Sequence, residues 1–189
     1  LLNLGLMTPT VEQGMAYHHV DVFADQPLGG NGLIVVLGAD HLPSALMQEV
    51  TREMRQFESI FLSAVDLPSR MATARIFTLD EELSFAGHPV LGAAAVLHSL
   101  VGDATSATWQ IRVADRPLIV QTHTQGDRMV AEMNQGAGTV GTPLSSGQAA
   151  RFLQALNLDV EDGHPQLPLQ PVSTGLPFAV TLYGIPSSL

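Results

Sequence analysis

The sequence predicts an α+β fold in which a mixed β-sheet wraps around one central helix. Short segments with strand periodicity outnumber helical ones, and they do not alternate with helices as they would in a βαβ protein. One segment, Gly87 to Leu100, is apolar on nearly every helical face. A helix of that kind is normally buried rather than laid on a surface. We therefore expect the strands to curl around it.

Composition limits the class of protein. The chain has 189 residues, of which 46% are hydrophobic, so it can bury a sizeable core and reads as soluble and globular. Only eight Lys and Arg stand against 18 Asp and Glu, which argues against nucleic acid as a partner. No apolar run approaches the roughly 18 residues of a membrane span, so no membrane partner is expected. The absence of Cys excludes disulfides and thiol nucleophiles and fits a cytoplasmic protein.

The chain divides into three parts. We interpret residues 1–14 as a leader or an added segment, because the patterned sequence begins directly after Met15. Residues 15–114 are expected to form an N-terminal barrel-like domain with the central helix, and residues 115–189 a partial second domain.

The first domain begins with strands and one amphipathic helix. In the helix, Met47, Val50 and Met54 recur at spacings of three and four. The predicted elements in order are a strand at Tyr17–Phe23, a strand at Leu33–Leu37, a helix at Ser44–Gln56, and strands at Ser59–Val65 and Ala72–Leu79. In the last of these strands, alternation places Ile76 on one face and Phe77 on the other.

The central helix follows, and Gly102 and Asp103 are expected to end it. The elements predicted after it are strands at Thr108–Val113, Leu118–His123 and Arg128–Met133, a helix at Ala149–Leu156, and strands at Gln170–Ser173 and Phe178–Tyr183. Residues 136–141 match a GxGxxG pattern, but Pro143 interrupts the helix that a dinucleotide site would need. His18 and His19 have no second ligand pair at metal spacing, so neither a cofactor nor a metal is expected.

The start of the central helix has the features of an anion site. Gly87 permits close approach of a ligand, and Pro89 suits the first turn of a helix. The unpaired N–H groups of that turn favour negative charge. We therefore expect a small anionic group to bind beside His88.

Several motifs in order resemble the phenazine-biosynthesis PhzF-type isomerase family. They are Asp21-Val22-Phe23, Gly30-Asn31, Phe57-Glu58-Ser59-Ile60-Phe61, Arg75-Ile76-Phe77-Thr78 with Glu82, Phe85-Ala86-Gly87-His88-Pro89, and Val172-Ser173-Thr174-Gly175-Leu176-Pro177. The resemblance covers about Tyr17 to Tyr183. It implies a diaminopimelate-epimerase-like fold of two similar domains with the active site between them.

The resemblance also implies a site. Glu58 occupies the position of the catalytic carboxylate, and His88 that of the histidine opposite, so both should face one cleft. Phe57, Ile60, Phe61 and Leu62 are expected to raise the pKa of Glu58 by desolvation. Gly87, Asn31, Ser173 and Gly175 are the predicted substrate-binding residues. The implied reaction is cofactor-free: a carboxyl group removes a proton from a ring carbon of a small cyclic acid and returns it elsewhere.

The absence of cysteine separates this chain from the two-thiol epimerases and racemases of the same fold. The chain also departs from the family, with Gly32, Leu79 and Ser84 where prolines are usual, and with no counterpart of the family's further C-terminal part. A carboxyl-based isomerase is the leading function. The alternative is a truncated, inactive homologue that serves as a binding or dimerisation module. Incomplete cover of strands such as Leu118–Val120 and Met129–Met133 would favour a homodimer. The sequence does not identify the physiological substrate.

Overall fold

The computed structural model describes residues 15–26, 28–102, 105–159, 164 and 167–181. The expected leader, Asp103, and the end of the expected strand at Tyr183 lie outside the described residues. The chain forms two compact units. The first contains residues 1–84 and 88–133, and the second contains residues 85–87 and 134–189.

The first unit is a curled mixed sheet. Its strands are β1 (Tyr17–Val22), β2 (Asn31–Val36), β3 (Glu58–Asp66), β4 (Met71–Thr78), β5 (Glu82–Leu83), β6 (Ser106–Val113), β7 (Arg116–Gln125) and β8 (Arg128–Met133). They are ordered β1-β2-β3-β4-β6-β7-β8, and β5 pairs with β4. The pairs β2–β3 and β4–β6 are parallel and the others antiparallel. The mixed sheet predicted from the sequence is confirmed.

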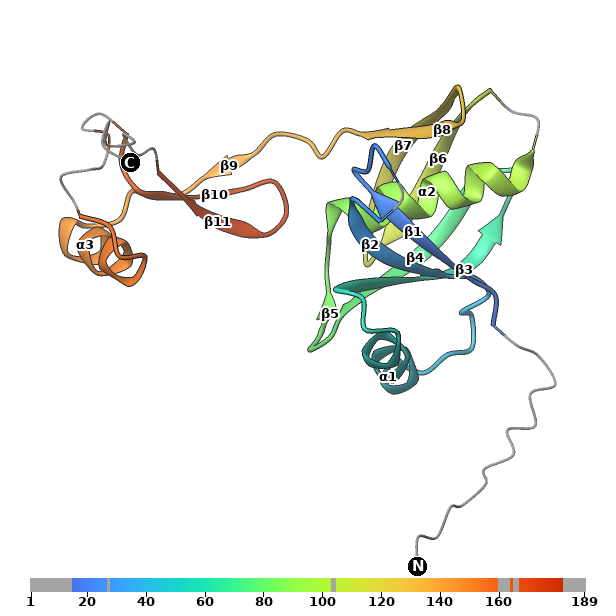
Figure 1. Ribbon diagram of the computed structural model, residues 1–189, viewed down its shortest axis with the longest axis horizontal. Coiled ribbons are helices and arrows are strands. Elements are labelled where there is room, and N and C mark those ends of the chain that lie inside the picture. The colour runs from blue at the N-terminus through green and yellow to red at the C-terminus, as the bar shows by residue number, and fades with distance from the viewer. Residues whose placement is uncertain (1–14, 27, 103–104, 160–163, 165–166, 182–189) are drawn as a thin grey trace, which may run out of the picture. The chain divides into compact units, whose positions relative to one another are not determined.

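Helix α2 (Gly87–Val101) lies within the curl of this sheet (Figure 1). Val90, Ala93, Ala94 and Leu97 have no exposed surface, as expected for a helix that is apolar on nearly every face. The helix ends at Val101, and Gly102 adopts a left-handed φ of 85°, a conformation that glycine tolerates best. The prediction of a buried central helix is therefore confirmed.

Helix α1 (Ser44–Met54) covers the opposite face of the sheet (Figure 1). The buried cluster there includes Met47 of the helix, Ile34 and Val36 of β2, and the perpendicular ring pair Phe61 and Phe77. The inner face carries the side chains that alternate with these, such as Leu33, Ile60 and Ile76. Both faces are therefore covered at these positions, which explains the continuous apolar run Leu33 to Val36 in β2.

The second unit contains shorter elements. They are β9 (Thr139–Val140), α3 (Ser146–Ala155), β10 (Gln170–Ser173) and β11 (Pro177–Val180), and the strands form a sheet in the order β11-β10-β9. Ser145 and Gln148 form a capping box at the start of α3. The GxGxxG stretch contains β9 and opens no helix, because α3 begins only at Ser146.

The boundary between the units differs from the expected one. The units separate after Met133, whereas the expected division at 114/115 falls in the turn between β6 and β7. Strands β7 and β8 continue the sheet of the first unit, and Leu118 and Val120 are no more than 2% exposed. The incomplete cover that would favour a homodimer is therefore not found at Leu118 and Val120 of β7, which the first unit buries itself. Within the described residues, no helix combines the length and the apolar character needed to cross a membrane.

Candidate active site

Glu58 is the first residue of β3 and is 7% exposed. It lies beside Leu33 of β2 and opposite Thr78 of β4. Alternation along β3 puts it on the same face as Ile60 and Leu62, which is the face turned toward α2. The sheet thus holds this carboxyl group inward at the end where β2 and β3 begin and β4 ends.

His88 is the second residue of α2, and Pro89 follows in the first helical turn. The side chain of His88 is 14% exposed, and its Nδ1 lies 3.4 Å from Oε2 of Glu58. The two predicted catalytic residues, separated by 30 positions in the chain, are therefore brought together. That they open onto a common cleft remains a prediction.

Burial shifts both groups toward their neutral forms. Desolvation raises the pKa of Glu58 and lowers the pKa of His88. Their separation also exceeds the usual range of a direct hydrogen bond. Burial thus disfavours the charged form of each group, and we do not describe the pair as a hydrogen-bonded ion pair.

Two polar atoms of the pair lack partners. Oε2 of Glu58 and Nε2 of His88 are buried and make no hydrogen bond with the described residues. Buried polar atoms in proteins are nearly always satisfied, so each exception needs an explanation, and a catalytic role is one of them. A carboxyl group whose pKa is raised is a stronger base when ionised, and a neutral imidazole can donate or accept a hydrogen bond beside it.

The neighbourhood that desolvates Glu58 differs from the one expected. Phe57 is 73% exposed, and Phe61 packs in the α1 cluster on the opposite face of the sheet. Successive residues of a strand point to opposite faces, so adjacency in sequence does not place an aromatic ring against this carboxyl group. Of the four expected neighbours, only Ile60 and Leu62 share its face.

Among the predicted substrate-binding residues, Asn31 is exposed and begins β2, two residues before Leu33. Gly87 begins α2, and a Cβ there would lie 2.9 Å from Nε2 of Gln135. The second unit thus brings the Gln135 side chain against Gly87, and no pattern in the sequence pointed to it. A glutamine in a loop has no periodicity that could reveal such a contact.

Ser173 and Gly175 belong to the second unit. The Gly175 N–H donates to Oγ of Ser173 at 3.1 Å. A Cβ at Gly175 would lie only 2.2 Å from the ring of Phe85, so packing alone requires glycine there. Their roles in substrate binding remain predictions.

Side chains of α1 and β4 hold the segment between Thr78 and His88. Gln48 donates to the Thr78 carbonyl at 2.7 Å, and Arg52 to the Leu79 carbonyl at 2.8 Å. Arg75 donates to Glu82 at 2.7 Å and stacks 5.2 Å from the centre of the Phe77 ring. Sequence reasoning identified Arg75 and Glu82 only as parts of a motif. These contacts fix the chain that leads from the strand beside Glu58 to His88.

A curled mixed sheet around a buried helix, with a buried Glu–His pair at the start of that helix, defines an epimerase-like α+β protein. The model of the PhzC-PhzF family, described as phenazine biosynthesis-like protein, matches residues 20–183. The chain therefore belongs to this family.

Relatives agree with this assignment. The uncharacterized isomerase YddE of Salmonella typhimurium is 35% identical over 84% of this chain and 52% of its own length. The trans-2,3-dihydro-3-hydroxyanthranilate isomerase of Pseudomonas fluorescens is 48% identical over 43% of this chain and 29% of its own. The chain thus spans about half the length of YddE.

Solved structures show the same fold. The structure of a predicted epimerase from Pseudomonas aeruginosa superposes with a TM-score of 0.82 at 43% identity, covering 90% of this chain and 60% of that one. The PhzF-family phenazine biosynthesis protein of Bacillus anthracis has a TM-score of 0.73 at 23% identity, covering 91% of this chain and 57% of that one. The second likeness supports the fold alone.

Proposed function

We propose that this chain carries the Glu58–His88 half of a PhzF-type isomerase site, in which Glu58 moves a proton between two carbons of a small cyclic acid. Ionised Glu58 removes a proton from a ring carbon, so a C–H bond breaks and a carboxyl O–H bond forms. The same proton is then returned to another carbon of the conjugated system, which restores the carboxylate. The step needs no redox partner, because the substrate and product are isomers.

The observation that carries this proposal is the buried Glu58 carboxyl group beside His88, with Oε2 unpartnered among the described residues. Desolvation raises the pKa of Glu58, which brings its proton affinity closer to what a carbon acid requires. His88, held neutral by burial, is suited to orient the substrate by a hydrogen bond. Gly87 at the helix start would receive the anionic group of the substrate.

Relatives from Pseudomonas are named trans-2,3-dihydro-3-hydroxyanthranilate isomerases. That compound is the first substrate to test, as a representative of small cyclic carboxylic acids. The assay measures isomerisation by absorbance and deuterium uptake at ring carbons in D2O. It compares the chain with its Glu58→Gln and Glu53→Gln variants.

We expect Glu58→Gln to lower turnover by about 10²–10⁴-fold with little change in substrate affinity, because it keeps the shape of the side chain and removes proton transfer. Glu53 is exposed on α1, so the same substitution there should leave turnover unchanged. Full turnover in Glu58→Gln would remove Glu58 from the mechanism.

A second candidate is an inactive binding or dimerisation module. Substrate binding without turnover by the unaltered chain would support it. A homodimer is part of the same proposal, since Val140 and Phe178 are each 66% exposed. Light scattering that gives a monomer would exclude the dimer. A cytoplasmic location remains a prediction.

A further inference from the structure

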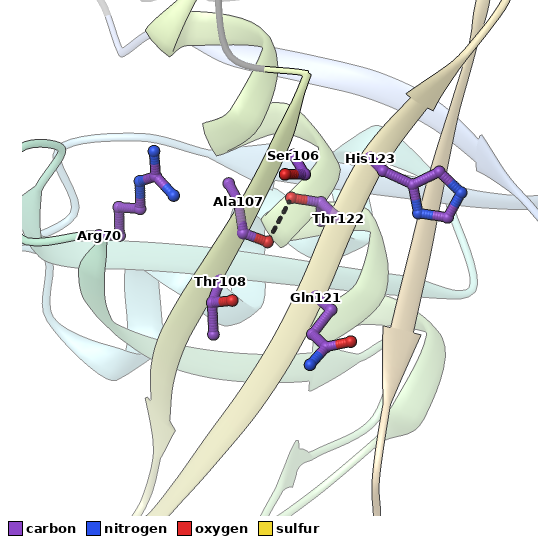
Figure 2. Close-up of a pocket in the computed structure, with 7 residues that line it drawn as sticks. All are labelled: Arg70, Ser106, Ala107, Thr108, Gln121, Thr122 and His123. Atoms are coloured by element: carbon purple, nitrogen blue, oxygen red, sulfur yellow. Dashed lines mark hydrogen bonds between the residues drawn. The ribbon is translucent and has the colours of Figure 1, made fainter.

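A polar hollow of about 250 Å³ lies on the first unit, where the start of β6 and the end of β7 meet the β3–β4 turn (Figure 2). Its lining consists of Arg70, Ser106, Ala107, Thr108, Gln121, Thr122 and His123. We call it the Arg70 hollow. Six of the seven side chains carry a nitrogen or a hydroxyl group, and none carries a carboxylate.

The absence of carboxylates from the lining is unusual for this chain, which has 18 acidic and only eight Lys and Arg residues. The nearest acidic groups by position are not part of the lining. Asp66 accepts the Ser69 N–H at 3.2 Å within the β3–β4 turn, and Glu132 lies opposite Gln121 on β8. The lining of the hollow therefore presents hydrogen-bond donors and no carboxylate, although the protein as a whole is acidic.

The pairing of β6 with β7 places these donors on one face. Ser106 lies opposite His123 and Thr108 opposite Gln121. The alternating residues Ala107 and Thr122 turn toward the buried side of the sheet. Figure 2 shows Arg70 on one side of this set and His123 on the other. Two hydroxyl groups, an amide and an imidazole thus accompany the guanidinium group.

Arg70 is fixed at its backbone. Its N–H donates to the Leu67 carbonyl at 3.2 Å, and its own carbonyl accepts the Gln110 N–H at 2.9 Å. Within the described part of the chain, no residue forms a hydrogen bond or an ion pair with its guanidinium group. A half-buried cation with a fixed backbone and no internal partner is available to a ligand.

The free side of β6 adds a backbone donor. Gln110 points its N–H toward the turn, and alternate residues of a strand point the same way, so Thr108 does too. Strand β4 pairs with β6 only from Met71 opposite Gln110 onward. Among the described residues, no strand therefore pairs with Thr108 on this side.

The wall of the hollow is rigid. Oγ1 of Thr122 lies 2.6 Å from Nδ1 of the buried His98 on α2 and donates to the Ala107 carbonyl at 3.4 Å. Rigid, pre-placed donors lose little entropy when they bind an anion. The hollow is smaller than typical pockets for drug-sized ligands, so it suits a small ion.

We propose that the Arg70 hollow binds a small oxoanion, a phosphate or a carboxylate, between the Arg70 guanidinium group and the donors of β6 and β7. This site is independent of the Glu58–His88 pair, since it uses other residues at the opposite end of β4. Arginine is the cation that best matches the planar, two-oxygen geometry of such groups. The net charge of −10 opposes anion binding over long range, so binding is expected to be weak and sensitive to salt.

The test titrates the ¹⁵N-labelled 189-residue chain at low ionic strength with inorganic phosphate and, in parallel, with malonate. We expect saturable movement of the Thr108 and Gln121 amide resonances in the millimolar range with at least one of the two anions. The anion that binds more tightly shows whether the hollow prefers a phosphate or a carboxylate. The absence of saturable movement at these amides with both anions would overturn the proposal.

Arg70→Gln should weaken binding at least about tenfold, because it removes the positive charge and the paired donors of the guanidinium group while keeping a polar side chain. Arg112→Gln is the matched control. Arg112 is exposed on β6 outside the hollow, so its loss should change affinity less than about twofold. Equal effects of the two substitutions would mean that the ion responds only to net charge, which would also overturn the proposal.

Thr108→Val gives a second, charge-neutral test that keeps the β-branched shape. It should weaken binding severalfold without altering the dispersion of the remaining spectrum. Unchanged affinity in both Arg70→Gln and Thr108→Val would exclude the hollow as the site.

Discussion

The two compact units differ in what their strands pack against. In the first, Leu33 to Val36 of β2 are each no more than 2% exposed, because α2 covers one face of the sheet and α1 the other. In the second, every residue of β11 is exposed, and α3 buries only Leu153. One unit is built around a helix, and the other, within the described residues, is not.

This difference shows what a central helix contributes. Phe178 of β11 is 66% exposed, so the free energy that burial of its ring would contribute is not gained within the described residues. The first unit therefore buries a continuous apolar core, whereas the described residues of the second unit bury few apolar side chains.

Replacing a helix leucine by alanine should reduce the stability of the protein far more in the first unit than in the second. Leu97 of α2 is fully buried, and Leu153 of α3 is 4% exposed but is the single buried residue of its helix. We expect Leu97→Ala to lower the free energy of unfolding by about 3–5 kcal/mol and Leu153→Ala by less than about 2 kcal/mol. Urea unfolding followed by circular dichroism measures both. Equal losses would show that the second unit is packed as tightly as the first.

Replacing a helix glycine by alanine should also have different effects in the two units, because the space around the added Cβ differs. A Cβ at Gly92 of α2 would lie 2.5 Å from Leu33 and 3.0 Å from Val22, whereas nothing lies within 4 Å of one at Gly147 of α3. Gly92→Ala should destabilise the protein by about 1–3 kcal/mol through overpacking. Gly147→Ala should stabilise it by up to about 1 kcal/mol through helix propensity. A stabilising Gly92→Ala would contradict the close packing of α2 against β1 and β2.

The buried carboxyl group should make the first unit sensitive to pH. Because burial raises the pKa of Glu58, its contribution to stability is present below the ordinary glutamate range and is lost as the pH rises through the folded-state pKa. Glu58→Gln is neutral throughout, so its Tm should exceed that of the unaltered chain at about pH 8 and match it at about pH 4.

The matched control for this pH effect is Glu53→Gln, which changes an exposed carboxyl group on α1. It should show no comparable difference between the two pH values in the same thermal unfolding experiment. A Glu58→Gln variant that is less stable at the higher pH would mean that the ionised carboxylate is favoured in the folded protein.

The smallest effect concerns the two edges of the curled sheet. Arg128 of β8 donates to the side chain and the carbonyl of Asp25, both at 2.9 Å, and so links one end strand of the sheet order to the loop that follows the other, β1. The pair is exposed, so Arg128→Ala should cost no more than about 1 kcal/mol, and added salt should reduce that cost. Urea unfolding at two salt concentrations measures this cost. A larger loss of unfolding free energy would mean that the Arg128–Asp25 contact is needed to hold the two ends of the sheet together.

Much of the secondary structure could be predicted from the sequence, because the spacing of apolar residues along the chain follows the period of the helix or strand that they form. The apolar run after Gly87 predicted α2, and the spacing of Met47, Val50 and Met54 predicted α1. The two-residue strand β5 was missed, since Glu82–Leu83 is too short to show a period and is held by pairing with β4. Family motifs, rather than periodicity, pointed to Glu58 and His88.

The amino-acid pattern was thus sufficient to predict a mixed sheet and a buried central helix, and the family motifs were sufficient to predict the candidate acid–base pair. That β7 and β8 extend the first sheet became clear from the structure alone, because hydrogen-bond pairing joins strands that no local pattern can assign to a domain. The structure also decided that Phe57 points away from Glu58 and that Arg70 meets the donors of β6 and β7. These placements depend on the register of the strands and on the curvature of the sheet. Both are set when strands that are distant in sequence pack their apolar faces against the same buried helix.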